Sequence, residues 1–230
     1  MTNDVSDRWR SAGTVSGFAS APPNPKLVAW ARGFVTDARR PLVLDIGCGA
    51  ARNAIPLATL GCRVVGLDLS EPMLTAAADR ARREQLPDAP PIDLRLVRGP
   101  MAPLPFRDGA FDVVVAHGVW NLARSDDEFR AALAEAARVC RTGGGLFLFT
   151  FSRGTLPAAA EPAPGQRFTH TQFAGEPQVF LTEAVLLDEF ARAGFVRDVP
   201  GPLTRYNARS PLSTTAKGPP ELWEGTFRRV

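Results

Sequence analysis

The stretch VLDIGCGAARN, residues 43 to 53, decides which fold this chain adopts. An aliphatic run that carries Asp45 leads into Gly47 and Gly49, and the residues that follow favour a helix. A buried strand that turns through glycines into a helix is typical of nucleotide-binding α/β folds. Arg52 occupies the position of the third glycine of the dinucleotide pattern, and the Asp45 carboxylate would repel a pyrophosphate. The turn therefore predicts a ligand that carries positive charge.

Strands and helices alternate along the chain on both sides of this turn. Apolar runs predict strands over residues 41–46, 62–69, 92–97, 111–117 and 145–152, with one more within each of 196–209 and 221–230. Helical periodicity covers residues 25–40, 50–61, 70–85, 125–144 and 181–195, with N-caps at Asn24, Ser70 and Thr182. This alternation predicts an α/β protein with a doubly wound, mostly parallel sheet.

The chain is expected to form a single domain over residues 1–230. Residues 1–24 have weak periodicity and form an N-terminal arm that is a candidate lid. Residues 25–152 carry the alternating pattern of the core, and residues 181–230 add the last helix and strands. Residues 153–180 are rich in Pro, Ala and Gly, so we expect an irregular insertion that is either a substrate lid or a surface excursion.

The composition disfavours several classes of protein. The formal net charge is only +3, and the cluster of Arg80, Arg82 and Arg83 is better explained by a solvated helix face than by nucleic-acid binding. Three cysteines and two histidines suggest neither a disulfide framework nor a metal site. No apolar run is long enough to span a membrane, and the polar N-terminus lacks a signal-peptide core, which predicts a cytoplasmic protein.

Further segments continue the pattern in order. Asp68 ends the second expected strand, about twenty residues after the glycines, where a carboxylate accepts hydrogen bonds from ribose hydroxyls. The segments are VVGLDLSEPML (64–74), LPFRDGAFDVVVAHGVWNL (104–122) and EAARVCRTGGGLFLFTF (135–151). Together with residues 43–53 they resemble the class I S-adenosylmethionine-dependent methyltransferases that act on small molecules. The resemblance implies a Rossmann-like, seven-stranded sheet whose last strand is antiparallel, with S-adenosylmethionine as the cofactor.

The same resemblance implies where the cofactor lies. Asp45 suits a cofactor that carries a sulfonium and an α-ammonium group. Pro100 stands where the family commonly has an acid that meets the adenine amino group, so adenine recognition is assigned to the Met101 backbone, to apolar packing or to another side chain. The expected cofactor-binding residues are Asp45, Gly47, Cys48, Gly49, Asn53, Asp68, Leu69, Met73, Met101 and His117.

Methyl transfer is an in-line displacement that depends mainly on positioning, and it needs a base only if the nucleophile loses a proton. His117 follows the fourth strand and is either a catalytic base or a local hydrogen-bonding partner. His170, within the insertion, faces either the substrate or water. Aromatic side chains are expected to line a pocket for a small, partly apolar methyl acceptor, and the candidates are Trp9, Phe18, Trp120, Phe168, Phe173 and Tyr206.

The sequence thus predicts transfer of a methyl group to an oxygen, nitrogen or sulfur nucleophile of a small molecule. A non-catalytic module that only binds the cofactor is an alternative, because binding motifs do not establish turnover. A nucleic-acid methyltransferase would need a basic stripe, and Asp45 with Arg52 argues against an NAD-dependent oxidoreductase. The identity of the acceptor and the oligomeric state do not follow from the sequence.

Overall fold

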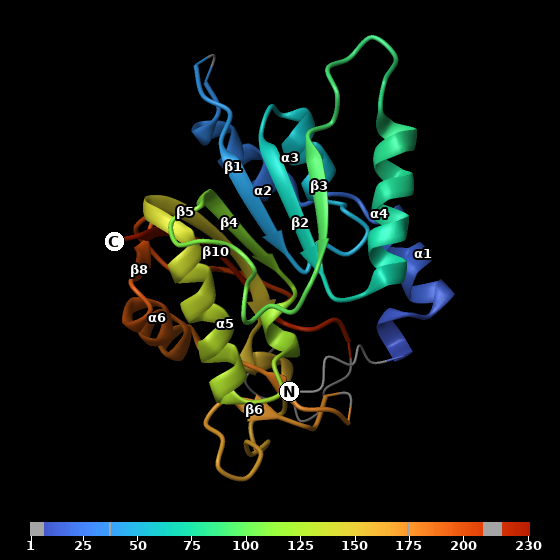
Figure 1. Ribbon diagram of the computed structural model, residues 1–230. Coiled ribbons are helices and arrows are strands. Elements are labelled where there is room, and N and C mark those ends of the chain that lie inside the picture. The colour runs from blue at the N-terminus through green and yellow to red at the C-terminus, as the bar shows by residue number, and fades with distance from the viewer. Residues whose placement is uncertain (1–6, 37, 174, 209–217) are drawn as a thin grey trace.

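The computed structural model describes residues 7–36, 38–173, 175–208 and 218–230, and a twisted sheet with helices on both faces lies at its centre (Figure 1). The strands follow the order β3-β2-β1-β4-β5-β10-β8, and β9 also pairs with β10. Strands β1 to β5 are parallel, whereas β10 is antiparallel to β5, β8 and β9. The strands are β1 (Leu42–Ile46), β2 (Arg63–Asp68), β3 (Leu94–Arg98), β4 (Phe111–His117), β5 (Cys140–Phe151), β8 (Phe195–Arg197), β9 (Thr204–Tyr206) and β10 (Leu222–Arg229).

This topology confirms the predicted Rossmann-like α/β sheet with an antiparallel last strand, but within the described residues the sheet has eight strands where seven were expected, because β9 also pairs with β10. Helices flank the sheet, and short 3-10 turns join several elements. The α-helices are α1 (Ala12–Ser20), α2 (Pro25–Ala31), α3 (Ala54–Thr59), α4 (Glu71–Glu84), α5 (Asp126–Val139) and α6 (Glu183–Arg192). The 3-10 turns are η1 (Asp7–Trp9), η2 (Arg32–Phe34), η3 (Trp120–Leu122) and η4 (Arg153–Thr155).

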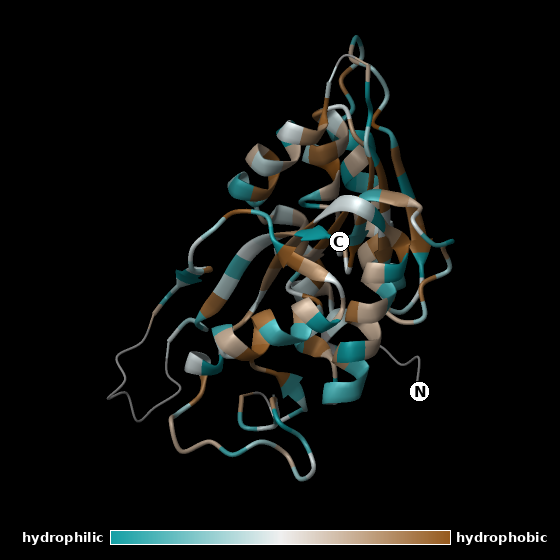
Figure 2. Cartoon of the chain, turned by 90° about the vertical axis from the view of Figure 1, so that its left-hand side faces the viewer, coloured by the Kyte–Doolittle hydropathy of each residue, from teal (hydrophilic) through white to brown (hydrophobic). Residues whose placement is uncertain are grey.

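Two hydrophobic cores lie on opposite faces of the sheet, because successive side chains of a strand point to opposite sides. One core joins the sheet to α2, α3 and α4 and includes Leu27, Val43, Ile55, Ala77 and Val113. The other joins the sheet to α5 and α6 and includes Leu44, Val114, Phe129, Leu186 and Phe190. The apolar strand segments therefore lie between the helix layers, as the brown ribbon in Figure 2 shows.

The three predicted N-caps are confirmed. The side chain of Asn24 accepts hydrogen bonds at the start of α2, Ser70 does so for α4, and Thr182 does so for α6. Each cap satisfies a backbone N–H group that the first helical turn leaves without a partner. The caps fix where these helices leave the strands, and two of them, Asn24 and Ser70, lie beside the glycine turn.

Several boundaries differ from those predicted, for local physical reasons. The arm contains α1, which packs against α4 although none of its residues is fully buried, so its apolar periodicity was too weak to detect. The helix expected over residues 125–144 ends at Val139, and β5 begins at Cys140. The strand expected within 196–209 is divided into β8 and β9, because Pro200 and Pro202 between them lack a backbone N–H.

The insertion 153–180 is more regular than predicted. It contains a two-stranded sheet of β6 (Thr169–His170) and β7 (Gln178–Val179). The buried Asp126 carboxylate at the start of α5 accepts hydrogen bonds from Arg167 N at 2.6 Å and Thr169 Oγ1 at 2.7 Å. This anchor holds the middle of the insertion against the core, so that part of the segment is a fixed element of the fold.

Candidate functional site

The predicted site residues of β1, β2 and β4 meet at the carboxyl edge of the sheet. Asp45 lies near the end of β1, Asp68 ends β2, and His117 ends β4. The glycine turn follows β1 with φ of +68° at Gly47 and +52° at Gly49, a backbone region that L side chains rarely adopt. A Cβ on Gly47 would lie 2.5 Å from Cγ2 of Val119, so this position also has no room for a side chain.

Asp68 holds the turn together. Its Oδ2 accepts a hydrogen bond from Gly49 N at 2.8 Å, and its Oδ1 accepts one from Ser70 N at 2.8 Å. Burial raises the pKa of this carboxyl, and the backbone N–H groups oppose that shift. Each carboxylate oxygen has a second lone pair, so both can still accept a hydrogen bond from a ligand.

Asp45 is the most unusual group at this edge. It is 2% exposed, and its Oδ2 has no hydrogen-bond partner among the described residues. Burial raises the pKa of this carboxyl to about 7, although the nearby charge of Arg52 lowers it. A buried acceptor without a partner is costly, so this oxygen points to a ligand that supplies a donor.

Arg52 lies between the glycine turn and His117. Its Nη2 is 3.0 Å from Nδ1 of His117, and its guanidinium carbon is 5.9 Å from the centre of the Phe18 ring. The His117 ring stacks on Phe149, with 4.3 Å between ring centres. Burial lowers the pKa of His117 to about 3, and the positive charge of Arg52 adds to this effect. His117 is therefore neutral at physiological pH.

A second polar group lies on the other side of His117. In register across three strands, His117 of β4 faces Phe149 of β5, which faces Glu224 of β10. Asn24 joins the two ends of this row, since its Nδ2 is 3.1 Å from Nε2 of His117 and donates to Glu224 Oε2 at 2.7 Å. Tyr206 OH donates to Glu224 Oε1 at 2.9 Å, which ties β9 to the same carboxylate.

The other predicted cofactor residues surround the turn. Asn53 is buried and its Oδ1 accepts a hydrogen bond from Asn24 N at 2.9 Å, while Met73 is buried below Gly49. Cys48 is buried under the turn, where burial raises its thiol pKa well above the usual range. Leu69 and Met101 are half-buried on the loops after β2 and β3.

The N-terminal arm lies over the glycine turn. The carbonyl oxygen of Trp9 accepts a hydrogen bond from Ser70 Oγ at 2.9 Å. The Trp9 and Phe18 rings are in edge contact at 5.6 Å, and Phe18 approaches to 3.7 Å from the position that a Cβ on Gly49 would occupy. Both aromatic side chains of the arm are half-buried at the site.

Three of the predicted acceptor or catalytic residues lie in the core instead. Trp120 is 1% exposed and packs against Phe129 and Phe190, because η3 folds back beneath α5. Phe168 packs on Phe129. His170 is 1% exposed, with Nδ1 3.1 Å from the carbonyl oxygen of Glu161, and burial lowers its pKa. All three side chains are therefore buried, and His170 packs on Phe180, which in turn contacts Phe151 and Phe173.

Phe173 and Tyr206 keep part of their surface exposed, as do two phenylalanines that are not among the expected acceptor residues. Phe149 and Phe151 end β5 on one face of that strand. Tyr206 lies 5.9 Å from Phe149, and Phe173 lies 5.3 Å from Phe151. The half-buried aromatic wall is therefore built on β5 and β9, not around Trp120.

Other residues of the site were also missed. In the sequence Arg52 marks the missing third glycine, and in the structure it also supplies a cation beside Asp45, which suits a zwitterionic ligand. Asn24 was assigned only as a helix cap. Glu224 gave no signal, because its importance depends on the register of β10 with β5.

The residues at this edge fit S-adenosylmethionine. The unpaired Asp45 Oδ2 suits an ammonium group, the Arg52 guanidinium suits a carboxylate, and Asp68 has acceptor capacity for ribose hydroxyls. Two carboxylates beside the turn would disfavour a diphosphate. The arrangement thus matches a nucleoside that carries an amino-acid group rather than phosphates.

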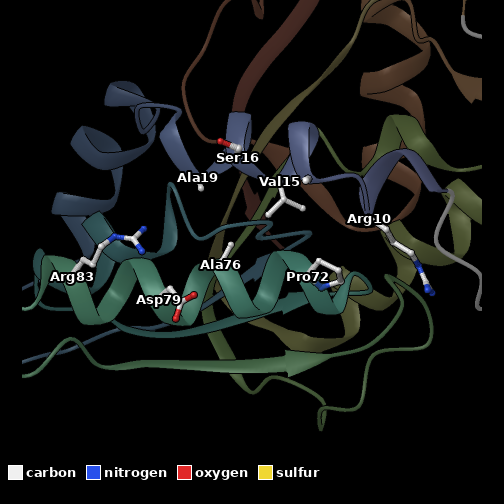
Figure 3. A pocket seen from close by; sticks show the side chains of 9 residues that line it. Arg10, Val15, Ser16, Ala19, Pro72, Ala76, Asp79 and Arg83 are labelled. Atoms are coloured by element: carbon white, nitrogen blue, oxygen red, sulfur yellow. The ribbon is translucent and has the colours of Figure 1, made fainter.

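A groove of about 440 Å³ lies elsewhere, between α1 and α4 (Figure 3). Val15 and Ser16 of α1 line one side, and Pro72 and Ala76 of α4 line the other. None of the predicted site residues lines it. In the described part of the chain, no helix has the length and apolar character needed to cross a membrane.

Comparisons with known proteins find similarity to methyltransferases. Residues 44–148 match the family model described as a methyltransferase domain. A demethylmenaquinone methyltransferase of Corynebacterium glutamicum is 36% identical over 116 residues, which are 50% of this chain and 44% of that protein. A cypemycin N-terminal methyltransferase of Streptomyces sp is 36% identical over 131 residues, which are 55% of this chain and 48% of that protein. The chain thus spans less than half of the length of these two relatives.

The fold is shared over nearly the whole chain. The crystal structure of Burkholderia thailandensis 1,6-didemethyltoxoflavin-N1-methyltransferase, with bound 1,6-didemethyltoxoflavin and S-adenosylhomocysteine, has a TM-score of 0.64. The alignment covers 97% of this chain and 84% of that one at 19% sequence identity, a level that supports the fold alone.

Proposed function

We propose that the chain is a class I S-adenosylmethionine-dependent methyltransferase and that it transfers a methyl group from S-adenosylmethionine to an oxygen, nitrogen or sulfur nucleophile of a small, partly apolar molecule. The observation that carries the proposal is the buried, unpaired Oδ2 of Asp45 beside Arg52 at the end of β1. These two opposite charges complement the ammonium and carboxylate of an amino-acid group. A dinucleotide offers only the negative charge of its pyrophosphate, which Asp45 would repel.

The residues that would hold the cofactor are distributed around the turn. Asp45 accepts from the ammonium group, Arg52 donates to the carboxylate, and Asp68 accepts from the ribose hydroxyls. Met101 and the loop around it offer apolar contact and a backbone N–H to the adenine, since Pro100 has no N–H. Trp9 and Phe18 of the arm cover this region and exclude water.

When bound, the cofactor supplies a methyl group that its sulfonium already activates for displacement. The residues of this chain need only bind both reactants, hold them in line and keep water out. Such positioning contributes on the order of 7–11 kcal/mol to lowering a barrier. His117 is neutral, and with Asn24 Nδ2 on its Nε2 the other ring nitrogen, Nδ1, can donate an N–H hydrogen bond to the methyl acceptor.

The acceptor is placed against the half-buried aromatic wall of Phe149, Phe151, Phe173 and Tyr206. Flat apolar walls with a few polar groups are typical of small-molecule pockets. One relative is named for demethylmenaquinone and one similar structure holds 1,6-didemethyltoxoflavin, whereas another relative is named for the N-terminus of cypemycin. We favour a small molecule, with the chain acting as one domain and the N-terminal arm as its lid; of that arm, residues 7–24 lie within the described part of the structure and residues 1–6 lie outside it.

Calorimetry and a methyl-transfer screen test the proposal together. S-adenosylmethionine and S-adenosylhomocysteine are expected to bind with micromolar dissociation constants, and NAD is expected to show no binding. Transfer of labelled methyl groups is then measured with phenols, quinols, amines, thiols and a short peptide. Tighter binding of NAD would overturn the cofactor assignment. Cofactor binding without turnover of any acceptor would favour the non-catalytic module, and turnover of the peptide alone would exclude a small-molecule acceptor.

A further inference from the structure

His117 has a hydrogen-bond donor on each side of its ring. Arg52 Nη2 lies 3.0 Å from Nδ1, and Asn24 Nδ2 lies 3.1 Å from Nε2. A guanidinium has donors and no acceptor, so the first contact requires a lone pair on Nδ1. The second contact requires a lone pair on Nε2 if the amide of Asn24 is oriented as a donor.

The orientation of the Asn24 amide is fixed by its other partners. Its Oδ1 accepts hydrogen bonds from Lys26 N at 2.9 Å and Leu27 N at 3.2 Å, as the N-cap of α2. Its Nδ2 donates to the buried Glu224 carboxylate at 2.7 Å. Reversing the amide would break all three hydrogen bonds, so the nitrogen of Asn24 must face His117.

A neutral imidazole cannot satisfy both neighbours. It has one N–H and one ring lone pair, whereas two acceptors are required here. Protonation would make both contacts repulsive. The arrangement is therefore strained, and it is relieved when one of the two donors moves away.

Arg52 is the donor that is free to move. Asn24 is held by the helix cap, by Glu224 and by a hydrogen bond from its own N–H to Asn53 Oδ1. Within the described residues, Arg52 makes no hydrogen bond or ion pair other than its contact with His117, and its flexible side chain lies near Asp45 and Phe18. It is thus close to the place where the proposed function requires a cation for the carboxylate of the cofactor.

We propose that Arg52 blocks Nδ1 of His117 in the cofactor-free protein and moves to the cofactor carboxylate on binding, so that Nδ1, which then carries the ring proton, can donate a hydrogen bond to the acceptor only after the cofactor is bound. This inference rests on the proposed function. It adds Arg52 as a switch residue that couples the two halves of the site, and it requires the cofactor to bind before the acceptor.

The charged groups around His117 support a link between cofactor binding and the pKa of His117. Arg52, from the turn before α3, lowers the pKa of His117 in addition to the effect of burial. On the opposite side Asn24 is neutral, and the Glu224 carboxylate behind it is shared with Tyr206 OH and with Lys26 Nζ at 3.4 Å. When Arg52 pairs with a carboxylate its charge is compensated, so the pKa of His117 rises.

Nuclear magnetic resonance of the imidazole tests the proposal without measuring catalysis. The chain has only two histidines, so a His170→Gln background leaves His117 as the single ring signal. In the free protein His117 is expected not to titrate down to about pH 5. With saturating S-adenosylhomocysteine its midpoint should rise from about 3 by about two pH units or more, so that protonation of His117 becomes visible above about pH 5. Methylthioadenosine, which lacks the amino-acid group, is the matched ligand and should leave the signal unchanged.

A variant and calorimetry complete the experiment. Arg52→Met should raise the midpoint of His117 without any ligand and should abolish the further shift with S-adenosylhomocysteine. If S-adenosylhomocysteine binds by calorimetry but leaves the titration of His117 unchanged, or if methylthioadenosine shifts it equally, the switch is refuted and the proposed function stands. If S-adenosylhomocysteine does not bind, both fail.

Discussion

Replacing Asp45 by asparagine should weaken cofactor binding and stabilise the cofactor-free protein. The substitution keeps the shape of the side chain and removes its charge. Two observations set the direction of both effects: the carboxyl is 2% exposed, and its Oδ2 lacks a partner among the described residues. The Asp45 carboxylate therefore destabilises the cofactor-free protein until a ligand supplies a donor.

The size of the folding effect follows from the pKa. The pKa of Asp45 is about 7 in the folded protein, against an ordinary value of 3.8. Between these values the folded protein binds more protons than the unfolded chain, so stability from this residue falls as the pH rises from about 4 to about 7. At 1.36 kcal/mol per unit, the full cost above pH 7 is about 4 kcal/mol. A buried unpaired amide costs about 1–3 kcal/mol, so the net gain of Asp45→Asn at pH 8 is about 1–3 kcal/mol.

The size of the binding effect follows from the lost charge. A hydrogen bond to a charged group contributes about 1.5–3 kcal/mol. The dissociation constant of S-adenosylhomocysteine should therefore rise by about 10- to 150-fold. Chemical denaturation at pH 5 and pH 8 measures the first effect, and calorimetry at pH 8 measures the second.

Asp112 provides a control of opposite sign within the same chain. It ion-pairs with Arg39 and Arg141 and accepts a hydrogen bond from Leu42 N, and these donors lower its pKa despite the cost of burial. Asp112→Asn should therefore destabilise the protein at pH 8, with less effect at low pH. The reasoning is refuted if Asp45→Asn is less stable than the wild type at pH 8, or if it binds the cofactor as tightly as the wild type does.

Three further substitutions test other parts of the site and its support. Asp68→Ala should weaken cofactor binding by about 1.5–3 kcal/mol and should also increase amide hydrogen exchange in the glycine turn that it holds; unchanged affinity would mean that the ribose is bound elsewhere. Phe18→Ala should speed cofactor dissociation about tenfold, or about 1.4 kcal/mol, in stopped-flow measurements, and an unchanged rate would exclude the arm as a lid. Asp126→Ala should lower the unfolding free energy by at least about 2 kcal/mol, because it frees the insertion; a denaturation midpoint equal to the wild type would contradict that anchor.

The fold could be predicted because its signals are local. The caps at Asn24, Ser70 and Thr182 each depend on residues within one helical turn. The glycine turn and the acids at the strand ends are likewise contiguous, and a parallel sheet brings strand ends together without further information. These features predict from the sequence alone that the glycine turn and the two acids meet at one edge of the sheet.

The acceptor half depends on contacts between distant segments. Trp120 follows a strand end, but η3 turns it under α5 into the core. Phe149 was assigned only to a buried strand, and its exposed edge follows from the end of β5. Glu224 reaches His117 only because β10 is in register with β5 and because Asn24 bridges the row. Pairing register between strands far apart in the sequence is set by the whole sheet, so no local pattern indicates it.

Two kinds of polar group matter in this chain. Some are fully hydrogen-bonded and stabilise the fold, and others are not and form part of the candidate site. The buried carboxylates of Asp126 and Glu189 are satisfied by several donors, including the bidentate pair between Glu189 and Arg130, so they hold elements in place. In the described part of the chain Asp45 has no donor for Oδ2, and His117 has one donor too many. Asp45 needs a hydrogen-bond donor, whereas His117 is relieved when one of its two donors moves away. Arg52 lies between these two residues. A ligand that offers an ammonium group to the first and a carboxylate to Arg52 relieves both at once, which is why an amino-acid group fits this edge of the sheet better than a phosphate does.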